Sequence, residues 1–168
     1  MNQSLPGRRT SARIAAVQAL YEMDMTDASA DPILNEFMAQ RWKQAGRDEN
    51  DDERATDLDD LPPFDDDLLK EIVNGVAANA GELDQFIDKA LTGKWTIERL
   101  EVLIRAILRA ATYEMRHMTE TNARIILNEY MGVSHSFFSG TEPGLINGVM
   151  DKLAHELRPH DVKKDSVS

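Results

Sequence analysis

The sequence predicts an all-α fold, a single compact bundle of about seven helices. Apolar residues recur at three- and four-residue intervals along most of the chain, the period of a helix that buries one face. No stretch shows the alternation of apolar and polar residues that is typical of a strand. The 168 residues, 42% of them hydrophobic, are enough for one domain with a sizeable core, so we expect one domain over residues 1–168.

The first predicted helix runs from about residue 10 to residue 25. Its apolar residues share one face and are expected to be buried: Ile14, Val17, Leu20 and Met23. No acidic residue occurs before Glu22, so the helix has a cationic end. A second helix is predicted from Asp31-Pro32, a capping acid followed by proline at a first helical position, to Gly46.

An acidic surface loop is predicted at residues 47–63. Eleven acidic residues and one base lie between Asp48 and Asp67, a local balance of −10 within a net charge of −11. This stretch lacks apolar periodicity and ends in two prolines, which is typical of a solvated loop. It either serves solubility alone or repels unsuitable nucleic-acid contacts. Because the rest of the chain is nearly neutral, its acidity does not exclude a polyanionic ligand.

Five further helices are predicted after this loop, over residues 69–80, 83–90, 96–116, 121–131 and 141–158. Gly81 is expected to form the joint between the first two. Thr96 is a suitable N-cap for the third, which is the most apolar helix and is expected at the centre of the core. Residues 160–168 are expected to form a flexible tail.

Two groups of arginines are candidates for binding nucleic acid. The first arginine cluster is Arg8, Arg9 and Arg13, and the second is Arg105, Arg109 and Arg116 along one edge of the central helix. Arginine suits this role because its planar fork binds phosphate bidentately and stacks on bases. The alternative is that both clusters are surface charges that pair with acidic neighbours: Glu22, Glu101 or Glu114.

Enzymatic chemistry has no assembled motif in the sequence. The chain has no cysteine, which excludes disulfides, thiolate nucleophiles and cysteine-based metal sites. Glu114 and His117 form half of a di-iron pattern without a second copy, so we expect a surface side-chain pair, no metal and no cofactor. Phosphate-binding glycine loops and the nucleophile elbow are also missing. The chain has no signal-peptide-like or membrane-spanning apolar run, which favours a cytoplasmic protein.

Several motifs together resemble one family. In chain order they are Arg8-Arg9-x-x-Ala12-Arg13-x-x-Ala16-Val17-Gln18-Ala19-Leu20-Tyr21, Asn74-Gly75-Val76 with Leu83-Asp84, the segment from Arg105 to Met115, Asn128-Glu129-Tyr130, and Ile146-Asn147-Gly148-Val149-Met150-Asp151. Their order and spacing are similar to those of the transcription antitermination factor NusB family over nearly the whole chain. Separate motifs in one order are far harder to reach by chance than any one alone.

The resemblance implies an all-helical RNA-binding factor without enzymatic activity. Such proteins pair with NusE, a ribosomal small-subunit protein, bind boxA-type single-stranded RNA and work in the RNA polymerase antitermination complex of ribosomal RNA operons. Carried over by residue, the resemblance assigns RNA contacts to Arg9, Arg13, Arg105, Arg109 and Tyr113, and a protein-partner contact to Tyr21. Arg8 is expected to add a nearby charge to the RNA contacts, and Glu98 is a further candidate contact with the protein partner. The alternatives left open are a helical protein-interaction scaffold that does not bind RNA directly, and a homodimer as the free form.

Four positions depart from the family pattern. Thr10 and Ser11 stand where some relatives continue an arginine run, Leu145 stands where a phenylalanine is usual, and Ile104 where an acidic residue often lies near the protein partner. Fewer charges and the loss of an aromatic ring predict weaker RNA contacts. We therefore expect RNA binding to depend on the protein partner.

Overall fold

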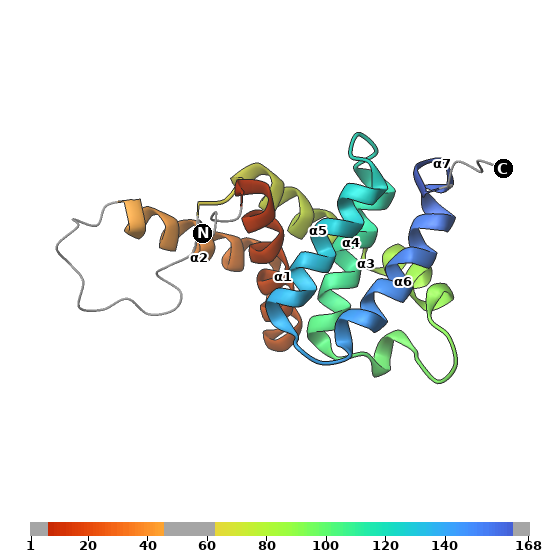
Figure 1. The fold of residues 1–168 in the computed structure, drawn as a ribbon. Helices are drawn as coiled ribbons and strands as arrows, with labels where there is room; N and C mark the ends of the chain where they lie inside the picture. The colour runs from red at the N-terminus through yellow and green to blue at the C-terminus, as the bar shows by residue number, and fades with distance from the viewer. Residues whose placement is uncertain (1–6, 46–62, 163–168) are drawn as a thin grey trace.

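The computed structural model describes residues 7–45 and 63–162, and the regular elements in these ranges are all helical (Figure 1). In order they are α1 (Arg8–Thr26), α2 (Ala30–Ala45), α3 (Asp66–Ala90), the 3-10 helix η1 (Ile97–Arg99), α4 (Val102–His117), α5 (Ala123–Phe137), α6 (Glu142–Leu157) and α7 (Pro159–Val162). The all-α prediction is confirmed. Residues 47–62 of the expected acidic loop and residues 163–168 of the expected tail lie outside the described residues, and residues 160–162 belong to α7.

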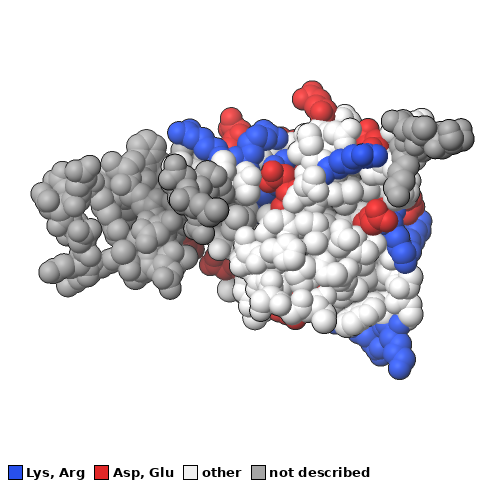
Figure 2. Space-filling view, viewed as in Figure 1, with Lys and Arg blue, Asp and Glu red and all other residues white. Residues whose placement is uncertain are grey.

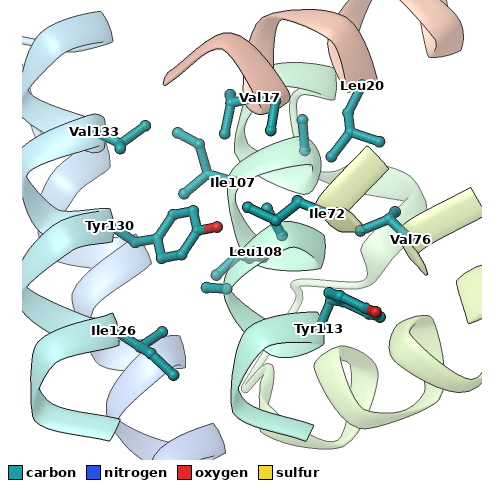
Figure 3. Packing of buried hydrophobic residues seen from close by; sticks show 14 of the residues in the cluster. Val17, Leu20, Ile72, Val76, Ile107, Leu108, Tyr113, Ile126, Tyr130 and Val133 are labelled. Atoms are coloured by element: carbon teal, nitrogen blue, oxygen red, sulfur yellow. The ribbon is translucent and has the colours of Figure 1, made fainter. Parts of the chain in front are cut away.

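Helix α4 is the centre of the bundle, because it packs against α1, α3, α5 and α6. Ile107 and Leu108 of α4 are fully buried. Figure 3 shows Val17 of α1 and Tyr130 of α5 converging on them from the two sides. The broad apolar stripe of this helix is explained by its position, since each side of α4 faces another helix and few of its residues reach solvent.

The joint expected at Gly81 and the N-terminus expected for the central helix both differ in the structure. Residues 66–90 form one helix, α3, with a kink at Asn79 instead of two helices joined at Gly81. The Asn79 backbone leaves helical geometry there, and its side chain donates a hydrogen bond to the carbonyl of Gly75 one turn earlier at 2.8 Å, a bond of the kind that accompanies bent helices. Thr96 precedes η1 and not the central helix, because Leu100 adopts an extended conformation and buries its side chain before α4 begins.

Helix α5 is longer than expected and continues past Gly132 to Phe137. Gly132 has open space around it and a helical backbone, so nothing there ends the helix. The hydroxyls of Ser134 and Ser136 donate to carbonyls four residues earlier, at 2.8 and 3.0 Å. These bonds satisfy the serine hydroxyls within the helix, so the run of small polar residues does not act as a turn.

Candidate nucleic-acid interface

The N-terminal end of α1 carries two exposed arginines, Arg8 and Arg9. The Arg9 side chain is 54% exposed, and its Nη1 lies 3.8 Å from Oδ2 of Asp65, a loose ion pair. Asp65 is also the N-cap of α3, where its side chain accepts from the amide of Leu68 at 3.1 Å, and its own amide donates to the carbonyl of Arg8 at 3.0 Å. These bonds fix the start of α1 to the start of α3. In Figure 2, blue Lys and Arg side chains are visible at this end with red acidic side chains beside them, and further blue side chains lie elsewhere on the same face.

The first turn of α1 adds positive potential to this end. Gly7 stands at the N-cap and has no side chain to cap the helix, and the first turn contains no acidic residue. The first amides of a helix have no intrahelical partner, and with the helix dipole they favour an anion. The two exposed arginines and the helix start without a side-chain cap therefore both favour the binding of an anion at this end.

Arg13 is buried, unlike its two neighbours in the first arginine cluster. Its side chain is 3% exposed, and it forms a bidentate pair with Glu114: Nε to Oε2 at 2.9 Å and Nη2 to Oε1 at 2.8 Å. Nη1 lies 3.5 Å from Oε2 of Glu129, which also accepts from Thr10 Oγ1 at 2.8 Å. Burial alone would lower the pKa of the Arg13 guanidinium, but hydrogen bonding and attraction to Glu114 outweigh it and raise the pKa.

This pairing has two consequences for the sequence-based expectations. Glu114 is fully buried and bonded to Arg13, so the expected surface pair with His117 is wrong. A direct contact of Arg13 with RNA stays a prediction, and it would require the guanidinium to leave Glu114. In the described conformation Arg13 joins α1, α4 and α5 from the inside.

The second arginine cluster is also paired with carboxylates. Arg109 forms a bidentate pair with Asp84 of α3, at 2.7 and 2.9 Å, and a further contact with Asp24 of α1 at 3.2 Å. Arg105 reaches the same Asp24 at 3.6 Å, and Arg116 bonds to Glu82 at 3.1 Å. Hydrogen bonding to Asp84 is the main cause that raises the pKa of Arg109. The acidic partners of this cluster come from α1 and α3. Of the acidic neighbours expected from the sequence, Glu114 is the one that pairs with an arginine within the described residues.

Arg105 and Arg109 lie at the end of α1 opposite to Arg8 and Arg9, whereas Arg116 is in the last turn of α4, toward the end where Arg13 meets Glu114. Helices α1 and α4 run antiparallel, because Arg13 faces Glu114 while Asp24 faces Arg105. Residues 8 and 24 of one helix are about 24 Å apart along its axis at 1.5 Å per residue. Arg8 and Arg9 are therefore separated from Arg105 and Arg109 by most of the length of α1.

Tyr113 is packed between α3 and α4. An added Cβ on Gly75 would lie 2.1 Å from the Tyr113 ring, so only glycine leaves room for the ring there. The ring stacks on His117 with 5.0 Å between centroids and an interplanar angle of 26°. Burial, followed by the nearby charge of Glu71, raises the pKa of the Tyr113 hydroxyl. His117 is exposed beside it, and its i, i+4 spacing from Tyr113 was the available sequence signal for this pair.

The residues expected at a protein partner are exposed. Tyr21 on α1 is 39% exposed and Glu98 of η1 is exposed as well. Of the four departures from the family pattern, Ile104 is buried, Leu145 packs partly buried against the core, and Thr10 bonds to Glu129. Ser11 is buried, with no bond of its hydroxyl to the described residues. These four side chains therefore serve the interior more than the surface.

Neither a metal cluster nor a membrane-spanning helix occurs in the described ranges. Within residues 7–45 and 63–162, no three His, Cys, Asp or Glu side chains come together as metal ligands. No helix in those ranges combines the length and the apolar character needed to cross a bilayer.

The helical fold, the buried core and the exposed arginines at the start of α1 define the class of protein: an all-helical protein with charged side chains at the ends of its helices. The model of the NusB family matches residues 10–155. Transcription antitermination protein NusB of Caulobacter vibrioides is 35% identical over 150 residues, which cover 89% of this chain and 94% of the relative. That of Gluconobacter oxydans is 36% identical, with 92% and 91% covered. The chain belongs to the NusB family of transcription antitermination factors, which are not enzymes.

Solved structures of the family have the same fold. NusB of T. maritima superposes with a TM-score of 0.69 at 22% identity, covering 95% of this chain and 99% of that one. A complex of the antitermination factors NusB and NusE with double-stranded RNA contains a chain that matches with a TM-score of 0.67 at 17% identity, covering 88% and 96%.

Proposed function

We propose that the protein binds boxA-type single-stranded RNA together with NusE and acts in the RNA polymerase antitermination complex, in support of ribosomal RNA transcription. Membership of the NusB family supports this proposal. A fold neighbour that contains NusB, NusE and RNA is consistent with it, although the RNA there is double-stranded. Transcription places the protein in the cytoplasm.

The exposed N-terminal end of α1 is the observation that carries the RNA assignment. Arg8 and Arg9 are exposed at the start of a helix whose N-cap residue, Gly7, supplies no side-chain cap, so phosphates can meet two guanidinium groups and the amides of the first turn. Arg13 holds the N-terminal part of α1 against α4 through its pair with Glu114. Arg105 and Arg109 would reach RNA only in competition with Asp24 and Asp84.

The partner face is proposed at the other end of α1. Tyr21 is exposed near the C-terminal end of the helix, and a tyrosine at an interface supplies apolar area with a polar tip. Glu98 is proposed as a further contact. This arrangement gives RNA and NusE separate footprints on one helix.

Fluorescence anisotropy of labelled boxA RNA with the full-length protein and NusE, measured across a salt series, tests the proposal. Each neutralised phosphate of a single strand contributes a slope of about −0.7 in log K against log [salt]. Arg8→Ala with Arg9→Ala should weaken binding and flatten the slope by up to about 1.4. Lys152→Ala, an exposed base on α6, is the matched control and should change neither quantity.

Unchanged affinity and slope in the double arginine variant would contradict the assignment of RNA to this end of α1. The same titration with Arg109→Ala decides whether the second arginine cluster takes part. A loss of folding stability without a change of slope would assign Arg109 to its carboxylate partners only.

A protein-interaction scaffold without direct RNA binding is the second candidate function. The pairing of Arg13, Arg105 and Arg109 with carboxylates favours it, since these guanidinium groups are already neutralised. In that case NusE would bind in the absence of RNA and Tyr21→Ala would weaken the complex, while boxA RNA would not bind at any salt concentration. Sedimentation velocity on the free protein would show whether a homodimer forms.

A further inference from the structure

A groove beside Arg9 has no role in the contacts described so far. It has a volume of about 370 Å³ and lies between the start of α1, helix α3 and the C-terminal end of α4. Its lining includes Arg9, Glu71, His117, Thr119 and Glu120. The groove therefore adjoins the end of α1 to which the proposed function assigns RNA.

His117 lines this groove with an aromatic ring that is stacked on a second ring. One face of its ring is stacked on Tyr113, and the residue is exposed. The Tyr113 ring is held in turn by its close approach to Gly75. The packing of Tyr113 therefore restricts the rotation of the His117 imidazole. Histidine is among the residues on which unpaired RNA bases stack.

The polar groups around the His117 ring suit the phosphate and the base amino group of a nucleotide. The Arg9 side chain is 54% exposed, and the contact that holds it within the described residues is the loose 3.8 Å pair with Asp65, so its guanidinium can turn to a phosphate. Glu71 and Glu120 supply carboxylates, which accept hydrogen bonds from exocyclic amino groups such as N4 of cytosine. Two carboxylates beside one arginine do not suit a phosphate-rich ligand alone, whereas they suit a base with an amino group.

We propose that this groove is a nucleotide subsite of the RNA interface, in which a base stacks on His117, its phosphate binds Arg9, and its amino group donates to Glu71 or Glu120. The subsite rests on the proposed RNA-binding function and extends it by one site and by a base preference. It selects cytosine, adenine or guanine over uracil, because uracil has no exocyclic amino group to donate.

The decisive experiment compares His117 variants in the anisotropy titration with boxA RNA and NusE. His117→Ala should weaken binding about tenfold and leave the salt slope unchanged, because base stacking on an aromatic ring carries no phosphate charge. His117→Phe should keep nearly the parental affinity, since it restores the stacking face. His155→Ala, an exposed histidine on α6, is the matched control and should bind like the parent.

Thermal unfolding of each variant separates a binding effect from a folding effect. A second readout is the ¹H–¹³C NMR signal of the His117 ring, which should shift upfield through the ring current of a stacked base when a cytidine dodecamer is added. A purely structural role of His117 would leave this signal in place.

The outcomes distinguish this inference from the proposed function. If the parent binds RNA and Arg9→Ala weakens it while His117→Ala binds like the parent, only the subsite is overturned. If the parent with NusE does not bind RNA, the proposed function fails and the subsite fails with it.

The base preference has its own test. Cytidine dodecamers should bind more tightly than uridine dodecamers, and Glu71→Gln combined with Glu120→Gln should narrow the ratio. Equal affinity of the two oligomers for the parent would overturn the assigned role of the carboxylates.

Discussion

Arg13 shows how one buried charge can be held inside a helical core. Both partners of the Arg13–Glu114 pair are almost fully removed from water, and the pair is stable because two short hydrogen bonds accompany the charge attraction. The sequence did contain a signal for this burial, since Arg13, Val17 and Leu20 follow i, i+4 and i+7 spacing on the core face of α1. The charge of the residue concealed it.

Removal of one partner of this pair should be costly. Arg13→Ala leaves the carboxylate of Glu114 buried and unpaired, and we expect the free energy of unfolding to fall by about 3–5 kcal/mol. Arg13→Met combined with Glu114→Leu removes both charges and should recover most of that loss. Urea unfolding of the three proteins measures both values. Equal losses in the single and double variants would contradict the role of the unpaired charge.

Glu114 is among the acidic neighbours named from the sequence, but its pairing with Arg13 could not be predicted because the two residues are distant in sequence. The same holds for the pairing of Arg109 with Asp24 and Asp84. Arg13 and Glu114 are separated by 101 positions, and Arg109 and Asp24 by 85. Hydrophobic periodicity identifies the buried face of each helix but not which helix lies opposite. The prediction therefore named exposed and buried arginines together as one RNA-binding set.

At the scale of the elements, the contact of α3 with α4 depends on a single glycine. Tyr113 of α4 lies against the backbone of α3 at Gly75, a close approach that no other residue allows. The composition of both helices predicts that they exist and are amphipathic. It does not predict the distance between their axes, because that distance depends on the Tyr113 ring fitting against Gly75, which has no side chain.

Gly75→Ala should destabilise the protein, since its Cβ would lie 2.1 Å from the Tyr113 ring. Overpacking of this kind costs about 1–3 kcal/mol, more than the gain in helix propensity. Gly81→Ala in the same helix meets nothing within 4 Å and should raise the free energy of unfolding by about 0.5–1 kcal/mol. Thermal unfolding of both variants gives the comparison. A stabilised Gly75→Ala protein would show that the ring can move away without cost.

The helix boundaries illustrate the limit of pattern reading. Within the described residues periodicity located the long helices, although it divided α3 into two, and the class and the central position of α4 followed from it. The kink at Asn79 and the extended residue Leu100 depend on one side-chain bond and one buried side chain, which no period reports. Such joints are decided by tertiary packing.

For the whole molecule, Arg158 ties the C-terminal helices to the turn between α4 and α5. Its guanidinium donates to the carbonyls of Met115, at 3.0 Å, Thr119 and Thr121, and pairs with Asp161 at 2.8 Å. Asp161 accepts in turn from the amide of Ala123, the first residue of α5, at 3.0 Å. One arginine and one aspartate thus connect α4, α5, α6 and α7.

Asp161 should make stability depend on pH in the acid range. The backbone hydrogen bond from Ala123 and the charge of Arg158 hold the pKa of its carboxyl below the ordinary 3.8. A lowered pKa in the folded state means that the contribution is complete above pH 3.8 and is lost as the pH falls through the folded-state pKa. The difference in unfolding free energy between the parent and Asp161→Asn should therefore be constant near neutral pH and shrink below about pH 4.

Urea unfolding at several pH values checks this behaviour, with Asp151→Asn, an exposed acid on α6, as the control. A difference between parent and Asp161→Asn that stays constant down to pH 2 would contradict the linkage.

The length of α1 has a consequence for assembly. Its 19 residues make a rod of about 28 Å that separates the arginine end from the Tyr21 end and is pinned to α4 near both. If a partner that also touches RNA binds at Tyr21, the rod fixes the span between the two RNA contacts. Once RNA is bound at one of these two contacts, the other contact forms at an effective concentration set by the span between them. Two weak RNA contacts therefore give a tighter complex even though they do not touch each other. Shortening or bending α1 would remove that gain while leaving each separate affinity intact.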